Sequence, residues 1–177
     1  ATRLDLMFSF QIVAYFFADK MPIPIDEEGK VSMKLTDWAE ANEVSAVNAH
    51  DAVADCYLMI HLARIIHDKA KPALQSSIIG SSKGGNLNIL QSDPFAMLSE
   101  VVRRKKFTYP VTFCGQNSKM PNEVAVVDLY YDPDQLDEMT DSELLEQMGS
   151  SGSAIIKLRI NKSLPIINSM NVPSLQD

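Results

Sequence analysis

Asn-Ala-His-Asp-Ala-Val-Ala-Asp, residues 48–55, stands where a polar lead-in meets a long apolar run that continues to Ile66. Asn48 suits a helix N-cap and Asp51 places an acid in the first turn, so we predict a helix over residues 49–67. His50 and Asp55 then lie in its first two turns. A histidine gains or loses a proton near neutral pH, and a carboxylate is a hard ligand that Mg²⁺ or Mn²⁺ accepts.

The spacing of this pair bears on whether the two side chains can serve one site. Positions five apart on an ideal helix differ by about 140°, so His50 and Asp55 do not share a narrow face. Asp55 leans back toward the helix N-terminus, because Cα–Cβ bonds tilt that way, and His50 can turn to meet the same object. An anionic phosphate with its metal would suit the N–H groups there. The alternative is a histidine that only ends the helix and a solvated or ion-paired aspartate.

Charge is unevenly distributed along the 177 residues. The net charge of −7 argues against a surface that binds polyanions in bulk. Basic against acidic residues number 7 to 11 over residues 1–80, 6 to 2 over residues 81–120, and 3 to 10 over residues 121–177. Positive charge is therefore concentrated in the middle segment, and we expect the acidic stretch 132–146 to face away from any bound nucleic acid.

The middle segment carries a compact basic cluster followed by a strand-like run over residues 107–113. The cluster supplies charge for a nucleic-acid backbone, and the run supplies rings for stacking bases. The alternative is a solvated basic end of a helix that we predict over residues 94–102. The candidate nucleic-acid-binding residues are Arg103, Arg104, Lys105, Lys106 and Tyr109, with Phe107 and Phe113 on the same run.

The remaining elements follow from hydrophobic periodicity. We predict a buried apolar helix over residues 4–17 rather than a targeting segment, a helix over 34–41, strands over 123–131 and 154–160, and an acidic helix over 139–148 with Leu144, Leu145 and Met148 inward. Trp38 is expected to anchor a core, with base stacking as the alternative. The Ser/Gly-rich residues 75–88 are the candidate domain boundary, and their order does not match a phosphate-binding loop.

The cysteine content and the hydropathy of the chain predict the kind of compartment in which the protein works. The two cysteines, Cys56 and Cys114, lie far apart and suggest no disulfide framework, which favours a reducing cytoplasmic environment. We expect both to be small buried hydrophobes. No apolar run reaches the roughly 20 residues that a membrane span needs, so no membrane partner is expected.

The pattern His-x-Ala-x-x-Asp at residues 50–55 resembles the third motif of the histidine-bearing DEDD exonucleases. The flanking text is similar to one family among them, bacterial exonuclease I: residues 34–42, Lys-Leu-Thr-Asp-Trp-Ala-Glu-Ala-Asn, precede the motif as they do in that family. Residues 124–129, Val-Ala-Val-Val-Asp-Leu, and 156–162, Ile-Lys-Leu-Arg-Ile-Asn-Lys, resemble two strands of its SH3-like second domain. The resemblance spans residues 5–165.

The resemblance implies a fold class, a reaction and roles for two residues. The fold would be α/β (α+β): the C-terminal helical part of a ribonuclease H-like exonuclease domain over residues 1–75, then an SH3-like domain with inserted helices over residues 76–177. The activity would be Mg²⁺-dependent (or Mn²⁺-dependent) 3′→5′ hydrolysis of single-stranded DNA in DNA repair or recombination. Asp55 would bind metal and His50 would deprotonate the attacking water. Single-stranded DNA and single-stranded DNA-binding protein would be the partners.

This sequence departs from the family pattern in one respect. An Asp-x-Glu in a strand and a second-motif aspartate, which the family places before its third motif, do not precede His50 here. We therefore expect a fragment with little or no nuclease activity by itself. A non-catalytic single-stranded nucleic-acid-binding module and a protein-interaction fragment remain alternatives, and the resemblance leaves the choice between DNA and RNA open.

Overall fold

A computed structural model of the protein describes residues 4–45, 51–102, 105–148 and 153–173. Helices lead, strands follow, and two short helices interrupt the strands. In chain order the elements are α1 (Leu6–Phe16), α2 (Leu35–Ala41), α3 (Ala52–Lys69), α4 (Lys71–Ile79), α5 (Lys83–Ser92), β1 (Ala96–Val102), β2 (Lys105–Gln116), β3 (Glu123–Asp128), α6 (Pro133–Asp137), α7 (Asp141–Gln147), β4 (Ile155–Arg159), β5 (Ile166–Asn168) and the 3₁₀ turn η1 (Ser169–Asn171).

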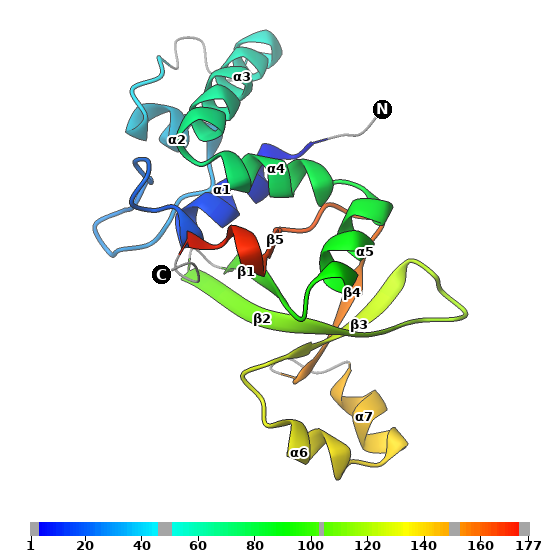
Figure 1. Ribbon diagram of the computed structural model, residues 1–177. Coiled ribbons are helices and arrows are strands. Elements are labelled where there is room, and N and C mark those ends of the chain that lie inside the picture. Colours follow the sequence, from blue (N-terminus) through cyan, green and yellow to red (C-terminus); the bar gives the residue numbers. More distant parts are fainter. Residues whose placement is uncertain (1–3, 46–50, 103–104, 149–152, 174–177) are drawn as a thin grey trace.

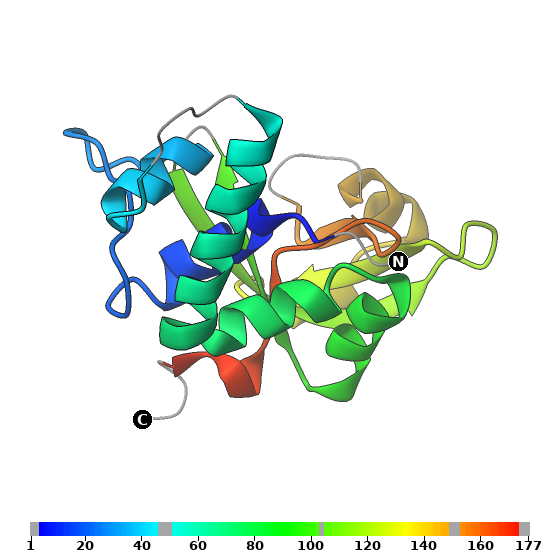
Figure 2. The same ribbon diagram turned by 90° about the horizontal axis from the view of Figure 1, so that it is seen from above.

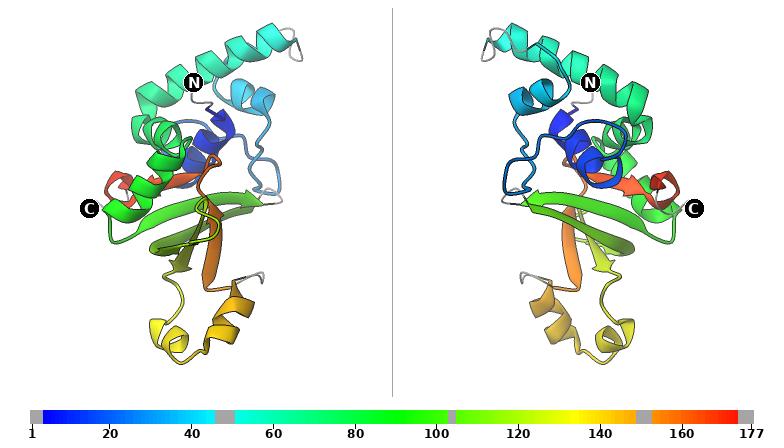
Figure 3. Two further views of the ribbon diagram at one scale, coloured as in Figure 1. Left: turned by 90° about the vertical axis from the view of Figure 1, so that its right-hand side faces the viewer. Right: turned by 90° about the vertical axis from the view of Figure 1, so that its left-hand side faces the viewer.

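The strands form one antiparallel sheet in the order β4-β3-β2-β1-β5, and helices lie on both sides of it. Ile167 of β5 packs into a core with α1, whereas its neighbour Ile166 packs into a core with α5, so α1 and α5 cover opposite faces. Figure 1 and Figure 3 show the short acidic helices α6 and α7 at the end of the molecule away from α1 to α4. Figure 2, viewed from above, shows α3 and α4 as outer helices over α1. Helices and antiparallel strands therefore combine in one α/β fold, as the sequence predicts.

The core of the helical side is built around two stacked aromatic rings. Trp38 on α2 is fully buried and stacks on Phe10 of α1, with ring centroids 4.2 Å apart and planes 6° from parallel. Its indole Nε1–H donates to the Ser32 carbonyl at 2.8 Å, so its polar edge is satisfied as well. The predicted helix over residues 34–41 and the core role of Trp38 are confirmed, and base stacking on this ring is excluded by its burial.

A second core, the sheet core, lies between α5 and the face of the sheet that α5 covers. Its buried side chains alternate along the strands, as a sheet with one covered face requires. Three polar residues of α4 and α5 are also buried: Ser76, Ser77 and Asn86. Asn86 Nδ2 donates to the carbonyls of Ile160 at 2.9 Å and Lys162 at 2.8 Å. The apolar members of this core are Ile89, Leu90, Ala96, Leu98, Val111, Val124, Val126, Leu158, Ile160 and Ile166.

The Ser/Gly-rich residues 75–88 are helical where we predicted a boundary loop. They form the end of α4, a short turn, and the start of α5, which Ser82 caps by accepting from Gly85 N–H at 3.1 Å. A Cβ on Gly85 would lie 1.9 Å from the Ile79 carbonyl oxygen, and one on Gly80 would lie 2.9 Å from that of Leu164. These glycines therefore permit close backbone packing. The division at residues 75/76 falls inside α4, and the two-domain organisation stays a prediction.

The predicted helix over residues 94–102 is wrong, because these residues form β1. Ala96 pairs with Val111 and Leu98 with Tyr109 across an antiparallel ladder. The spacing of Phe95, Leu98 and Val101 fits a helical period, but the sheet buries Ala96 and Leu98 on one face at period two. Tertiary pairing with the long strand β2 thus overrides a weak local pattern.

The predicted strands over residues 123–131 and 154–160 are confirmed as β3 and β4, and the acidic helix as α7. Thr140 caps α7 in a reciprocal capping box with Glu143. The inward orientation that we predicted for Leu145 is wrong, because this side chain is 70% exposed. None of the helices that the structure describes is long and apolar enough to span a membrane.

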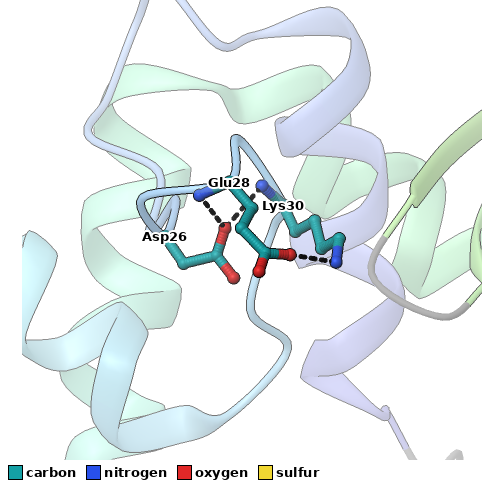
Figure 4. A network of polar contacts seen from close by, with 3 residues as sticks. All are labelled: Asp26, Glu28 and Lys30. Carbon is teal, nitrogen blue, oxygen red and sulfur yellow. Dashed lines mark hydrogen bonds and ion pairs between the residues drawn. The ribbon is translucent and has the colours of Figure 1, made fainter.

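The acidic turn after α1 is organised by one carboxylate. Asp26 Oδ1 accepts from the backbone N–H of Glu28 at 3.1 Å and of Lys30 at 2.8 Å, and Lys30 Nζ forms an ion pair with Glu28 (Figure 4). Gly29 has φ +74°, a left-handed conformation that glycine adopts without steric cost. The turn is largely exposed, as its composition predicts.

Candidate functional site

The candidate catalytic pair falls at the beginning of α3, where Asp51 is the N-cap. Its Oδ1 accepts from Val53 N–H at 2.8 Å, and Asp55 N–H donates to the Asp51 carbonyl at 2.9 Å as the first helical bond. The helix therefore begins at Ala52, three residues later than predicted, and Asn48, the expected cap, lies outside the described residues. Asparagine and aspartate cap helices about equally well, so the local sequence does not decide between residues 48 and 51 as the cap.

Asp55 lies in the first turn of α3 and is partly buried. Its spacing places it on the same side of the helix as the buried Leu58 and Leu62, three and seven residues on. A carboxylate in a first turn is stabilised by the helix dipole. Asp55 thus occupies the position that the sequence predicts, at the end of the helix and turned toward the body of the protein.

His50 lies outside the residues that the structure describes, so its meeting with Asp55 stays a prediction. Within residues 4–45, 51–102, 105–148 and 153–173, no three His, Cys, Asp or Glu side chains come together in a way that could hold a metal ion. A divalent cation takes six or more oxygen ligands, several of them from protein in a two-metal site. Among the described residues, Asp55 would therefore supply one ligand of a site that needs others.

The face of α3 opposite Asp55 is apolar and exposed. Val53, Tyr57 and Ile60 follow one another at helical spacing with exposed fractions of 63%, 61% and 48%. Leu58, Leu62 and Ile66 form the buried stripe of α3 instead. Cys56 and Cys114 are both exposed, which corrects their expected burial. For Cys56 the error has a simple cause: apolar residues lie on several faces of α3, so periodicity alone does not choose its inner face.

The basic cluster follows a strand rather than a helix, so its interpretation as a basic helix end is wrong. Arg103 and Arg104 lie outside the described residues. Lys106 Nζ donates to the Ala14 carbonyl at 3.1 Å and lies 5.9 Å from the ring centre of Tyr15. Lys106 therefore stabilises the C-terminal end of α1, where a cation complements the helix dipole.

The aromatic residues of β2 differ in burial. Tyr109 and Phe113 are partly buried and pack against the sheet core, on the same face as Val111. Burial, followed by the charges of Glu100 and Asp128, raises the pKa of the Tyr109 phenol above its usual value of 10.0. Phe107 is 40% exposed at the other end of the strand, beside the exposed Lys105. The ring and the charge most accessible to a ligand on β2 are thus those of Phe107 and Lys105.

Known proteins share both the sequence and the fold of this chain, although no family model matches it. Exodeoxyribonuclease I of Buchnera aphidicola is 26% identical over 167 residues, which cover 87% of this chain and 39% of that protein. The structure of E. coli exonuclease I in complex with a dA16 oligonucleotide superposes with a TM-score of 0.77 at 20% identity, over 97% of this chain and 39% of the other.

Two further solved structures agree. Exonuclease I from Methylocaldum szegediense has a TM-score of 0.77 at 22% identity, with 97% of this chain and 39% of that chain covered. The complex titled SSB/exonuclease I with the inhibitor CFAM has a TM-score of 0.75 at 20% identity, with 97% and 38% covered. The resemblance to exonuclease I predicted from the sequence is confirmed, and this chain spans about two fifths of the length of the proteins it matches.

Proposed function

We propose that this chain is part of a 3′→5′ exonuclease that degrades single-stranded DNA in DNA repair or recombination. One observation carries the proposal: the last residue of the His-x-Ala-x-x-Asp pattern stands in the first turn of α3, in a fold shared with exonuclease I. The similarity in sequence runs through this motif and continues into the sheet. A cytoplasmic location fits both the chemistry and the two exposed, unpaired cysteines.

In the proposed enzyme, Asp55 binds a Mg²⁺ or Mn²⁺ ion and His50 removes a proton from the attacking water. The metal supplies a Lewis acid that stabilises charge on the phosphate oxygens. The described residues contribute one carboxylate to this site, so the other ligands must come from elsewhere in the complete enzyme. We therefore expect the 177-residue chain by itself to show no metal-dependent nuclease activity.

The decisive experiment changes Asp55 to Asn in the full-length parent protein and measures release of nucleotides from a single-stranded oligonucleotide. Removing a residue that only hydrogen-bonds to a metal ligand lowers metal affinity or activity about 10- to 100-fold. Loss of a ligand itself should therefore lower kcat at least about 100-fold. His50→Ala should lower it by a similar factor, and EDTA should abolish the wild-type reaction.

Asp51→Asn is the matched control for this experiment. It removes a carboxylate four residues away on the same turn, yet asparagine caps a helix about as well as aspartate. Activity within twofold of wild type is expected for Asp51→Asn. Equal losses for Asp51→Asn and Asp55→Asn would show a general effect of charge at this helix end, and unchanged turnover in Asp55→Asn would refute the assignment.

The same proposal puts a single-stranded DNA contact at the start of β2. Its described members are the exposed Lys105 and Phe107, together with Lys106 and Tyr109, and its other two members, Arg103 and Arg104, lie outside the described residues. Figure 1 shows the acidic helices α6 and α7 below the sheet and away from the start of β2, where they would not repel such a strand. We propose single-stranded DNA-binding protein as a further partner, since one similar structure is a complex of SSB and exonuclease I.

This contact is tested by the salt dependence of oligonucleotide binding. Lys105→Ala should weaken binding and reduce the slope of log affinity against log salt by about 0.7, the value for one phosphate contact on a single strand. Phe107→Ala should weaken binding with the slope unchanged. Lys157→Ala, on the outer side of the sheet, is the control and should change neither.

A second function rests on the same two exposed residues: a single-stranded nucleic-acid-binding module without catalysis. It predicts that the 177-residue chain binds oligonucleotides equally well with EDTA, and that Asp55→Asn changes neither binding nor any property of the parent enzyme. Loss of turnover in Asp55→Asn with binding retained decides for the nuclease.

A further inference from the structure

One broad side of helix α3 is apolar and exposed, although the helix has another apolar side that is buried. Leu58, Leu62 and Ile66 pack into the helical core, and Figure 2 shows α3 at the outside of the molecule. A helix that is apolar nearly all round is ordinarily buried nearly all round. The exposed apolar residues, which we call the open face of α3, are Ala52, Val53, Cys56, Tyr57, Met59 and Ile60.

The open face is larger than the scattered apolar residues of an ordinary protein surface. Val53 and Tyr57 are 63% and 61% exposed. Met59 and Ile60 are 40% and 48% exposed. These four large side chains follow one another within about two helical turns. Contiguous apolar surface of this kind marks a place where another surface packs, because burying it is favourable.

The open face borders Asp55. Ala52 stands three residues before this carboxylate and Met59 stands four residues after it, and such positions are neighbours on a helix surface. Asp55 itself is partly buried, at the boundary between the open face and the side that packs into the helical core. A segment that covers Ala52 and Met59 therefore also lies next to Asp55.

Two observations identify what covers the open face. The chain spans 39% of the length of exodeoxyribonuclease I of Buchnera aphidicola, so most of a parent enzyme of that size lies outside it. Asp55 supplies one ligand of a metal site that needs others, and the groups that complete this site must approach α3 beside the open face. A nucleic-acid strand fits the open face less well, because its six side chains include no cation for the phosphates.

We propose that the open face of α3 is an interface covered by the remaining part of the parent enzyme, in which Cys56, Met59 and Ile60 are buried. The interface rests on the proposed function, which takes the complete enzyme to be longer than this chain. The covering segment presents an apolar surface to α3 and thereby holds its own groups beside Asp55. The apolar pattern that predicts burial of Cys56 then describes the complete enzyme.

The two cysteines make the test direct, because Cys56 lies on the open face and Cys114 lies on β2, and both are exposed in this chain. Alkylation by N-ethylmaleimide is followed peptide by peptide in a mass spectrometer, in the 177-residue chain and in the full-length parent. Each rate is divided by the rate in the same protein unfolded in urea. Cys56 should react at least about tenfold more slowly in the parent, since a thiol in a packed interface reacts only when the interface opens.

Met59→Gln locates the interface, because glutamine is similar to methionine in length and helix propensity but carries a polar amide. In the 177-residue chain it should change neither the urea midpoint nor the rate at Cys56. In the parent the amide would be buried without a partner, and Cys56 should react about fivefold faster or more. Ile78→Gln, at a side chain of α4 that is 51% exposed, is the matched control and should leave the rate at Cys56 unchanged in both proteins. Ile60→Gln repeats the test if Met59→Gln folds poorly, and the rate at Cys114 reports folding.

Equal rates at Cys56 in the chain and in the parent would overturn the proposal. Protection that rises with the concentration of the 177-residue chain would also overturn it, because a second copy would then be the occupant. Protection of the parent only in the presence of a single-stranded oligonucleotide would make the open face a ligand surface instead. The interface and the nuclease can fail separately: Asp55→Asn in the parent should lower turnover and leave Cys56 protected, whereas a parent that degrades DNA with Cys56 exposed would keep the nuclease and refute the interface.

Discussion

The two buried cores of this protein obtain their specificity in different ways. The helical core is joined by large side chains, with Trp38 stacked on Phe10 at its centre. The sheet core is aliphatic, and α5 is held beside it by close backbone approaches, of Gly80 to Leu164 and of Gly85 to the end of α4, and by the buried amide of Asn86. The comparison teaches that volume specifies one core, whereas small residues and directed hydrogen bonds specify the other.

The short strand β5 connects the two cores. Ile166 and Ile167 are adjacent on β5, so their side chains point to opposite faces of the sheet. Both are fully buried, Ile166 in the sheet core and Ile167 in the helical core. We therefore expect the described part of the chain to unfold as one cooperative unit, in which damage to either core is felt by both.

Trp38→Ala is the largest expected perturbation and tests whether volume decides the helical core. It removes the stacked ring and leaves the Ser32 carbonyl without its indole donor. Substitutions of this size in a core cost about 3–5 kcal/mol of unfolding free energy. Urea denaturation followed by circular dichroism measures the change. Tyr57→Ala, on the exposed face of α3, should stay within about 0.5 kcal/mol; comparable losses for the two would contradict the assigned core.

Gly85→Ala tests the opposite principle in the sheet core, where adding a single methyl group should be harmful. Its Cβ would lie 1.9 Å from the Ile79 carbonyl oxygen, a backbone atom that moves only with α4. We expect a loss of about 2–3 kcal/mol in the same urea experiment, at the upper part of the range for overpacking.

Gly84→Ala is the control, one residue away in the first turn of α5. Its Cβ would meet no atom within 4 Å, so alanine should stabilise the helix by about 0.5–1 kcal/mol. Opposite signs for two adjacent Gly→Ala changes would be a sharp signature of close packing. Equal signs would mean that helix propensity alone governs this turn.

The sequence predicts elements best where local pattern and tertiary role agree. The β-branched runs of β3 and β4 and the inward Trp38 of α2 are examples, because burial and propensity point the same way there. It fails for β1, whose apolar spacing fits two periods, and for residues 75–88, whose glycines look like a loop until their contacts with Ile79 and Leu164 are known. Which atoms approach a glycine is a three-dimensional fact.

The candidate site shows the same limit. Asp55 can be predicted from a short pattern because its position in a first turn is a local property. The burial of Glu123 at the start of β3 cannot, since an acid there is ordinarily solvated and its surroundings include the 117–123 turn, which folds back on the strand. The different environments of neighbouring residues on β2 are equally hard to predict. Lys106 donates to the Ala14 carbonyl of α1, far away in sequence, whereas Phe107 is exposed.

The smallest expected effect on global stability concerns α7, which buries no residue and therefore contributes to neither core. Glu143 Oε2 accepts from the Thr140 N–H and hydroxyl, each at 2.8 Å, and these bonds lower the pKa of Glu143 below its usual value of 4.5. A lowered pKa in the folded helix means that the carboxylate stabilises it above pH 4.5 and that this support is lost as the pH falls below it.

Thr140→Ala removes the hydroxyl that accepts from Glu143 N–H and donates to Glu143 Oε2, and it keeps the backbone half of the capping box. It should cost about 1 kcal/mol of helix stability, felt locally. Hydrogen exchange at the Glu143 and Leu144 amides should accelerate about fivefold at pH 7, while the urea midpoint of the whole protein stays unchanged, because α7 adds nothing to either core. Lowering the pH from 6 to 3.5 should narrow the difference between wild type and Thr140→Ala, since protonation of Glu143 weakens the hydroxyl–carboxylate bond that the wild type alone has. A shift of the global midpoint would instead make α7 a third structural support, and the two-core description would have to be abandoned.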